Sequence, residues 1–529
     1  MGEVIESYEH AAQPGRVRAM PALLARVDRT WLALAVLLVC VCAVHVGTLL
    51  RVPPASTDEG WNAARGLALL QTGQAYGTLD AGVFDRYVGY WTYFPLLGTA
   101  IHAAFIGVFG VSLFALRLAS VAFGLLLVAE VYVIARTLYN PRAGLLAGFL
   151  VASSFPFLFS SHLGRHDIIA AAMGFGAIAL CVTGDRGRFP AKSLLAGLLA
   201  GLTLDVHPNG LIYGPAVAAL YVCDFRWAFF RSRRFWAFVA GGCIAVLYFV
   251  AIHILPYPQT YFELYRIGNG SGRTPPLLDL GGQALSSFVD FASDLLSWQL
   301  LPFVAALALL LFRRSASDVK LLVLLGTLTV GFAALIRNKE PHYGILIYPA
   351  ISLVIAVLLL SLFDGARRAS PLDFARPLVA WAILAISIAP VLIPVVTYDF
   401  DRDLRTVQDN MRGSVAAGSP VIGAPAFWFG LTDHPYYSWA QLAYYRRAVP
   451  NSTLEDAFRA LHPDYLITDP HIDSWITTDP SLVSQQSFGL YVYKPQYDTF
   501  LAKRATLLSK TTTNTFGNVR IYRIDWTKP

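Results

Sequence analysis

Long apolar runs separated by short basic links are the feature that most constrains the fold of this chain. The first run covers residues 31–50, and similar runs recur as far as residue 396. About 20 apolar residues in a row are enough for a helix to cross a bilayer. Hydrophobic residues make up 56% of the sequence and charged residues only 14%, whereas soluble domains carry about 25% charged residues. The pattern therefore predicts a polytopic α-helical membrane protein.

Basic residues in the links predict which side of the membrane each link faces. Arginines precede the first run, so the positive-inside rule places segment 1–30 in the cytoplasm. That run is long enough to span the bilayer, which is not typical of a cleavable signal peptide. The net charge of +7 comes from the links and not from one basic face, which argues against a nucleic-acid binder. The five cysteines show no pairing or metal-binding spacing, and we interpret them as packing residues.

Residues 31–398 are expected to form the transmembrane domain, with about eleven crossings. We take 118–135 as the second crossing and 95–110 as a helix along the outer interface. If 95–110 also crossed, the basic turn at Arg136 would lie outside. Segment 193–223 is interpreted as two short crossings around an external turn. The remaining expected crossings are 143–160, 168–183, 235–255, 295–312, 321–336, 344–363 and 377–396.

The composition changes at residue 399 to that of a soluble domain. Segments 421–423, 465–468, 490–493 and 519–522 are typical of strands, and 454–461 of a helix. Residues 399–529 are therefore expected to form an α/β domain with its own core. An odd number of crossings puts this domain on the side opposite to the N-terminus, outside the cytoplasm.

Two adjacent carboxylates, Asp58 and Glu59, follow the first crossing, in a first external loop of residues 51–95. Most other conspicuous polar residues also fall at the outer ends of crossings. Ionisable groups at membrane depth are costly unless they are paired or hydrated, so we expect these ends to share one water-filled cavity. The polar residues assigned to the outer side are Asp58, Glu59, Arg165, His166, Asp167, Asp205, His207, Lys339, Glu340 and His342.

This mixture of acids and cations indicates a group transfer. Carboxylates suit removal of a proton, and Lys or Arg suits an anionic leaving group. The outer face of a membrane offers no cytosolic nucleotide, so the transferred group must arrive on another carrier. A lipid phosphate is the most plausible one.

At this point the residues resemble the GT-C glycosyltransferases. Asp58-Glu59 follows the first crossing, Arg165-x-Asp167 opens a later one, and an external α/β domain ends the chain. The nearest groups are bacterial relatives of protein O-mannosyltransferases and of the aminoarabinose transferase that acts on lipid A. Residues 338–343 are similar to the His-Lys-Glu-x-Arg-Phe pattern of the mannosyltransferase branch, but Asn338 replaces the first His and His342 replaces the Arg.

The resemblance implies an inverting glycosyltransferase in a bacterial plasma membrane, with a polyprenyl-phosphate sugar as donor. Asp58 is then the general base, Glu59 positions Asp58 or the acceptor, and Asp167 orients the substrate or a cation. No cofactor is implied; a divalent ion on these three carboxylates is compatible with the reaction but not required. The acceptor is a glycolipid, a polysaccharide or a protein. The residues expected to bind the lipid phosphate and sugar are Arg165, Lys339, Glu340, His342 and His207.

Each of these assignments has a structural alternative. Asp58 could only cap an interface helix, Arg165 and Asp167 could form a local ion pair, and Asp205 with His207 could satisfy the backbone of their own turn. Two other functions also remain open. One is a secondary transporter, although the charges lie at the ends of crossings and no repeat is apparent. The other is a membrane anchor that presents residues 399–529 as a binding module.

Overall fold

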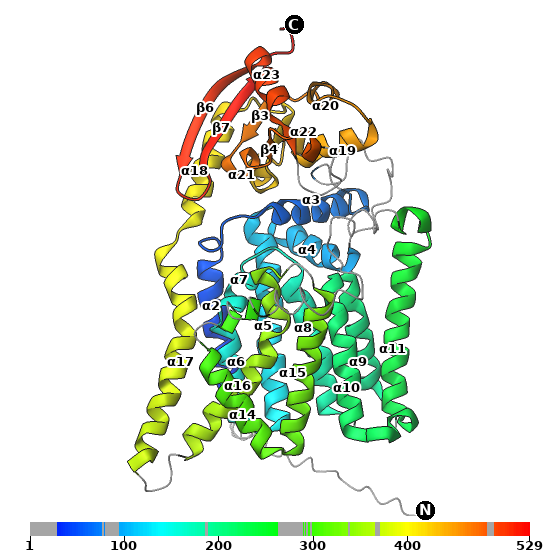
Figure 1. The fold of residues 1–529 in the computed structure, drawn as a ribbon, viewed down its shortest axis with the longest axis vertical. Helices are drawn as coiled ribbons and strands as arrows, with labels where there is room; N and C mark the ends of the chain where they lie inside the picture. The colour runs from blue at the N-terminus through cyan, green and yellow to red at the C-terminus, as the bar shows by residue number, and fades with distance from the viewer. Residues whose placement is uncertain are drawn as a thin grey trace, which may run out of the picture.

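The computed structural model describes residues 29–76, 79, 95–185, 189–262, 299–336, 339–365, 371–483 and 491–528, together with 289, 291–292 and 295–296. Figure 1 shows a bundle of upright helices with a small α/β domain at one end, which we call the domain end. The upright helices are α2 (Arg29–Thr48), α5 (Leu113–Leu138), α6 (Pro141–Ala152), α8 (Asp167–Thr183), α9 (Ala191–Leu202), α10 (Tyr213–Phe225), α11 (Arg233–Phe249), α14 (Leu300–Arg313), α15 (Ala316–Leu335), α16 (Tyr348–Gly365) and α17 (Pro371–Thr397).

Several of these helices have the length and composition of membrane spans. Within the described ranges, five segments are long and apolar enough, and a bent pair formed by α6 and α7 (Phe155–Ser161) is a sixth. The five are Arg29–Thr48, Leu113–Leu138, Arg233–Ile254, Ala316–Leu335 and Ala375–Ser414. The predicted class, a polytopic helical membrane protein with a C-terminal region that contains a sheet, is confirmed.

One expected crossing is not straight. The sequence predicts a single helix over 143–160, but the chain bends by 62° between α6 and α7. Ser154 causes the break, because its Oγ accepts a hydrogen bond from the backbone N–H of Phe157, 3.2 Å away, and so starts a new helix.

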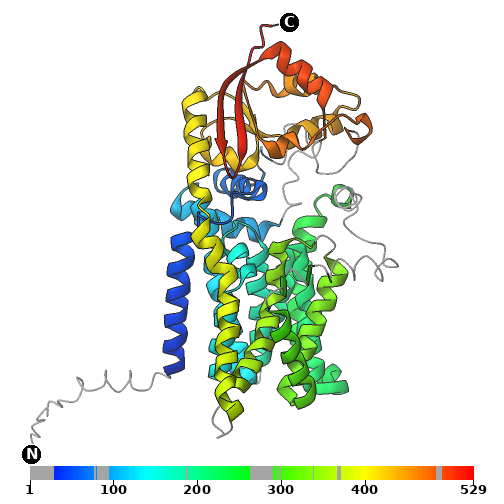
Figure 2. The same cartoon turned by 60° about the vertical axis from the view of Figure 1, so that its left-hand side comes forward.

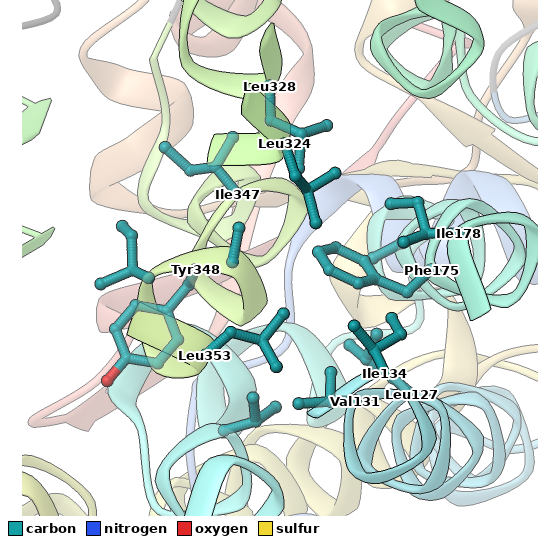
Figure 3. Packing of buried hydrophobic residues seen from close by; sticks show 14 of the residues in the cluster. Leu127, Val131, Ile134, Phe175, Ile178, Leu324, Leu328, Ile347, Tyr348 and Leu353 are labelled. Carbon is teal, nitrogen blue, oxygen red and sulfur yellow. The ribbon is translucent and has the colours of Figure 1, made fainter. Parts of the chain in front are cut away.

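Two kinds of packing hold the bundle together. Figure 3 shows large apolar side chains of α5, α8, α15 and α16 meeting in the centre. At the edge, α9 and α11 touch backbone to backbone: a Cβ on Gly197 would lie 1.9 Å from the carbonyl oxygen of Phe238, and one on Gly241 would lie 2.0 Å from that of Leu194. Such close contacts between small residues are typical of helix pairs in lipid, where apolar burial alone gives no driving force.

A layer of two helices separates the bundle from the domain. Figures 1 and 2 show α3 (Thr57–Thr72) and α4 (Leu96–Phe109) lying across the ends of the upright helices. This is the arrangement predicted for residues 95–110.

The domain is built on a mixed sheet of five strands in the order β2-β1-β3-β7-β6. β1 is parallel to β2 and β3, whereas β7 is antiparallel to β3 and β6. The predicted strands and helix are present. Of the segment 490–493, Val492–Tyr493 pairs with Ile476–Thr477 in a separate small sheet, and Leu490 lies outside the described residues. The five strands are β1 (Val421–Gly423), β2 (Tyr436–Ser438), β3 (Tyr465–Thr468), β6 (Ala505–Thr513) and β7 (Gly517–Ile524). The helical segments are α18 (Phe400–Ser414), η8 (Pro425–Gly430), α19 (Ala440–Ala448), α20 (Leu454–Leu461), α21 (Pro470–Asp473), α22 (Pro480–Val483) and α23 (Lys494–Arg504).

The apolar core of the domain extends into the layer beneath it. Ala63 and Ala64 of α3 belong to the same buried cluster as Phe427 and Trp428 of η8. The sequence predicts a domain with a core of its own, whereas the domain and α3 share one.

Candidate active site

The helix that carries the carboxylate pair starts one residue before it. α3 begins at Thr57, and the backbone N–H of Ser56 donates to Glu59 Oε2 over 2.9 Å. Ser56 therefore occupies the cap position. Asp58 is not the cap of this helix, so its carboxylate remains available for other contacts.

Glu59 is completely buried and holds a second buried charge. Its carboxylate forms a fork with Arg117 of α5, with Nε to Oε1 at 2.7 Å and Nη2 to Oε2 at 2.9 Å, and neither side chain is exposed. The N–H of Gly164 donates to the same Oε1 over 2.7 Å, and Arg117 Nη1 donates to the carbonyls of Leu49 and Pro53. Glu59 thus joins α3 to α5 and to the loop before α8.

Asp58 points the other way and meets a guanidinium from that loop. Asp58 Oδ2 forms an ion pair with Nη1 of Arg165; Asp58 is 39% exposed and Arg165 14%. Arg165 Nε donates to Oδ2 of Asp167 over 2.9 Å, and Asp167 is buried at the first position of α8. Burial is the largest influence on the pKa of Arg165 and lowers it, but the charges and hydrogen bonds of Asp167 and Tyr343 together outweigh burial, so the pKa is raised and Arg165 stays a cation. One guanidinium therefore bridges two carboxylates.

One face of α3 follows the loop along its length. Asp58, Asn62 and Arg65 are spaced i, i+4 and i+7, which places them on one side of a helix. Asn62 Nδ2 donates to the carbonyl of Gly164 over 2.9 Å. Burial is the main reason that the pKa of His166 lies well below its usual value, and nearby Arg65 acts in the same direction. The position of α3 therefore sets the position of Asp58 relative to Arg165.

Two turns complete the site. His207, just before η3 (Pro208–Ile212), has its Nε2 3.6 Å from Asp167 Oδ1. Tyr343, in η7 (Pro341–Leu346), has its ring centroid 5.6 Å from that of His207 and 5.9 Å from the guanidinium carbon of Arg165. His342 precedes Tyr343 and interacts electrostatically with Asp167. Residues far apart in the chain thus meet around Arg165.

The two histidines are not cations at neutral pH. Burial lowers the pKa of His342 to about 4 and also lowers that of His207, although Asp167 opposes the shift in both cases. They can donate or accept hydrogen bonds at a phosphate, but they add no positive charge.

Lys339 and Glu340 lie directly before η7, the segment that carries His342 and Tyr343. Partial burial lowers the pKa of Lys339. Arg337 and Asn338 lie outside the described residues, so the first position of the predicted motif is not placed.

Asp205 was expected either to face the shared cavity or to satisfy the backbone of its own turn, and the structure gives it a different role. Its carboxylate accepts from the N–H groups of Leu96 at 2.8 Å and Leu97 at 3.2 Å, the first residues of α4, and from the hydroxyl of Tyr248 at 3.0 Å. His253 Nε2 lies 2.9 Å from Oδ1. Asp205 therefore caps α4 and ties it to α11, instead of satisfying its own turn.

No group of three or more His, Cys, Asp or Glu side chains that could hold a metal ion occurs among the residues placed by the structure. Asp58 and Asp167 each face Arg165, and Glu59 faces Arg117. The carboxylates predicted to share a divalent ion are thus each paired with a guanidinium.

Sequence reasoning missed Arg117, Asn62 and Tyr343. Arg117 offered a signal, because a lone arginine beside an apolar run must find a partner if it is buried. Starting the predicted crossing at residue 118 hid this signal by leaving Arg117 in a link.

Comparisons with known proteins agree with this fold. The model of the dolichyl-phosphate-mannose-protein mannosyltransferase family matches residues 94–254, which include Arg165, Asp167 and His207. No curated protein matches the sequence.

Several solved structures match over most of the chain, including the following two. ArnT from Cupriavidus metallidurans, bound to undecaprenyl phosphate, has a TM-score of 0.61 at 13% identity, covering 92% of this chain and 97% of that one. The oligosaccharyltransferase of Archaeoglobus fulgidus in its apo form has a TM-score of 0.54 at 12% identity, covering 93% and 74%. The predicted resemblance to the GT-C superfamily is confirmed: the family matched and both of these proteins are glycosyltransferases of that superfamily, and this chain has their fold.

Proposed function

We propose that this GT-C membrane protein is an inverting glycosyltransferase that moves a sugar from a polyprenyl-phosphate donor to an acceptor hydroxyl at the outer face of the membrane. The observation that carries the proposal is the pairing of Asp58 with Arg165 at the domain end. A carboxylate that is 39% exposed can reach an incoming hydroxyl, and a guanidinium beside it can hold a phosphate.

In the proposed reaction the acceptor oxygen attacks the anomeric carbon while Asp58 takes the hydroxyl proton. A new bond forms between that oxygen and the carbon, and the bond from the carbon to the phosphate oxygen breaks. The phosphodiester leaves as a monoester with one additional negative charge. Arg165 and Lys339 stabilise that charge, so no divalent cation is required.

The two contacts of Arg165 suggest how donor binding readies the base. Asp167 holds the guanidinium through Nε, so Nη1 is free to exchange Asp58 for a donor phosphate without loss of position. Asp58 then faces the acceptor. His207, His342 and Tyr343 surround the same guanidinium and orient the phosphate by neutral hydrogen bonds. Glu59 positions Asp58 through Arg117 and does not touch the substrate.

The choice of donor is supported by ligands of similar structures. ArnT has been solved with undecaprenyl phosphate, and AglB from Archaeoglobus fulgidus with an inhibitory peptide and dolichol-phosphate. We propose a polyprenyl phosphate as the carrier here, because this chain has the same fold and has a cationic site at Arg165. A glycolipid, polysaccharide or protein hydroxyl is the acceptor.

The proposed orientation is supported by the basic residues of the links and by the alternating directions of the upright helices (Figure 1). We propose about eleven crossings, with segment 1–30 in the cytoplasm and residues 399–529 outside a bacterial plasma membrane. The proposed crossings are α2, α5, α6 with α7, α8, α9, α10, α11, α14, α15, α16 and α17.

Mass spectrometry of co-purifying lipids tests the function. We expect Asp58→Asn to fold, to retain a polyprenyl-phosphate glycan, and to release free polyprenyl phosphate about 10²–10⁴-fold more slowly than the parent protein. EDTA should leave the parent rate unchanged. Asp401→Asn is the matched control, because Asp401 also lies in the first turn of a helix and pairs with an arginine, Arg405, away from the site. Undiminished transfer by Asp58→Asn would remove the proposed base.

A further inference from the structure

The C-terminal domain touches the helix that carries the proposed base only two residues from that base. Gly60 of α3 lies against Pro425, the first residue of η8. A Cβ on Gly60 would be 2.2 Å from the carbonyl oxygen of Pro425 and 2.6 Å from its carbonyl carbon. The obstacle is backbone and follows directly on β1, so it cannot turn aside as a flexible side chain would. Only glycine lets the domain come this close.

A second contact lies one residue further along α3. The carbonyl oxygen of Leu79 accepts from Nε1 of Trp61 over 3.2 Å and from Oγ of Ser438, the last residue of β2. Leu79 is completely buried. The carboxyl ends of the neighbouring parallel strands β1 and β2 thus both rest on the region that begins with Asp58.

A different side of α3 rests on α4, although less closely. A Cβ on Gly66 would be 3.3 Å from the backbone N of Ala103 and 3.1 Å from Cδ1 of Ile106. α3 is therefore held between the domain on one side and α4 on the other. Glycine in a helix costs conformational entropy, so glycine at both contacts indicates that close approach is what these positions require.

We propose that the C-terminal domain positions Asp58 for catalysis, with Gly60 as the positioning residue. This inference rests on the proposed function of Asp58. The domain sets the distance between α3 and the loop of Arg165, and with it the geometry of the carboxylate. The domain is then part of the catalytic apparatus although it contributes no group to the reaction. Misplacement of a reacting group by about 1 Å can cost about 10²-fold in rate.

Gly60→Ala in the full-length protein tests the proposal. The added methyl group must push Pro425 and α3 apart, and the ion pair of Asp58 with Arg165 should open. We expect labelling of Asp58 by carbodiimide and glycine ethyl ester, read by peptide mass spectrometry, to rise several-fold. Release of polyprenyl phosphate should fall by about 10²-fold, while binding of added undecaprenyl phosphate stays within about two-fold because Arg165 and Lys339 remain.

Gly47→Ala is the matched control, because Gly47 lies within α2 and a Cβ there meets nothing within 4 Å. It should change neither labelling nor rate. Ser438→Ala provides a second variant without a steric clash, and it should change labelling and rate in the same direction by a smaller factor. This variant decides the outcome if Gly60→Ala does not fold.

The results separate the two proposals. Unchanged labelling of Asp58 in Gly60→Ala, or in Ser438→Ala if the first does not fold, would overturn the positioning role. Labelling is independent of turnover, so it decides that point even if the parent protein transfers no sugar. One result would refute the inference alone and leave the proposed function standing. In that result Asp58→Asn loses rate, whereas Gly60→Ala keeps the labelling and the rate of the parent protein.

Discussion

At the scale of single residues, the buried pair of Glu59 and Arg117 shows how much a site depends on groups that never meet substrate. Breaking one partner of a buried ion pair typically costs about 3–5 kcal/mol, because the other charge is left without a partner. Both side chains have no exposed surface, and each also satisfies backbone groups of neighbouring segments. The pair therefore fixes the start of α3 more firmly than apolar packing alone.

A double-mutant cycle tests this coupling. Glu59→Gln and Arg117→Met should each lower the thermal stability of the purified protein strongly. The double variant should lose less than the sum of the two, because neither charge is then buried alone. Melting temperatures in one detergent measure the effect. Strictly additive losses would contradict the coupling.

Buried histidines near the site predict a dependence of stability on pH. His102 in α4 is fully buried, stacks on His166 with ring centroids 4.7 Å apart, and has neither ring nitrogen hydrogen-bonded. Burial lowers its pKa to about 3. The unfolded chain binds a proton below about pH 6.5 and the folded chain does not, so stability is present above that pH and is lost as the pH falls.

We expect His102→Phe to flatten this dependence. At pH 5 the penalty from one such histidine is about 2 kcal/mol. The variant should therefore melt higher than the parent at pH 5, with a smaller difference at pH 7. His471→Phe, at an exposed position of α21, serves as control. If the melting temperature fell equally for the parent and for His102→Phe between pH 7 and pH 5, the explanation would be refuted.

Residue chemistry made part of the site predictable. That Asp58, Arg165 and Asp167 meet was predictable, because charged groups at the ends of apolar runs need each other. The fork of Glu59 with Arg117 was not found, since it joins residues 58 positions apart and only the fold brings them together. His207 and His342 were named from the sequence as candidate site residues. Their lowered pKa values were not predictable, because they depend on burial, which the sequence does not give.

At the scale of elements, α4 is held at its start by a residue from another part of the chain. Asp205 accepts from the first two N–H groups of α4 and contacts Tyr248 and His253 of the segment that follows α9 and α10. A side-chain cap of this kind contributes about 0.5–2 kcal/mol. The cap therefore secures the layer on which α3 rests.

Removal of this cap should loosen the start of α4. In Asp205→Ala, the amides of Leu96 and Leu97 should exchange with deuterium roughly 2- to 30-fold faster, which corresponds to the lost cap. Amides in the middle of α8 should be unchanged. Exchange measured by mass spectrometry on the purified protein checks this, and unaltered protection of α4 would show that Asp205 is not its cap.

Some elements were predictable in detail and others were not. The helix at 454–461 was placed correctly from its apolar pattern, and Thr453 and Asp456 form a capping box at its start. The strand β6 was missed, since Ala505–Thr513 lacks a clear alternation and is a strand because it pairs with β7. The bend between α6 and α7 was also missed, because two serines within an apolar run are an ambiguous signal.

At the scale of the whole molecule, the order of apolar runs and basic links was enough to predict the class of fold. Which faces of the runs would pack together was not predictable, because an all-round apolar helix has no marked side. The shared core of α3 and the C-terminal domain was missed for the same reason: Ala63 and Ala64 are typical of any helix.

The proposed orientation predicts how the protein reacts with a membrane-impermeant maleimide. Asn514→Cys, in the exposed turn between β6 and β7, should react in intact cells. Ala228→Cys, exposed in η4 (Arg226–Arg231) at the other end of the bundle, should react only after the membrane is permeabilised. The parent protein with its native cysteines gives the background, and labelling of both variants in intact cells would overturn the orientation.

The contact of Ser438 with the Leu79 carbonyl spans 359 residues of chain. At about 5–20 residues per second, a ribosome takes on the order of tens of seconds to close that interval. Throughout this time α3 lacks the C-terminal domain that covers it. A nascent protein with all its apolar helices inserted is thus still unfinished, and a product cut short before the last segment would expose the alanine and tryptophan surface of α3 to proteolysis.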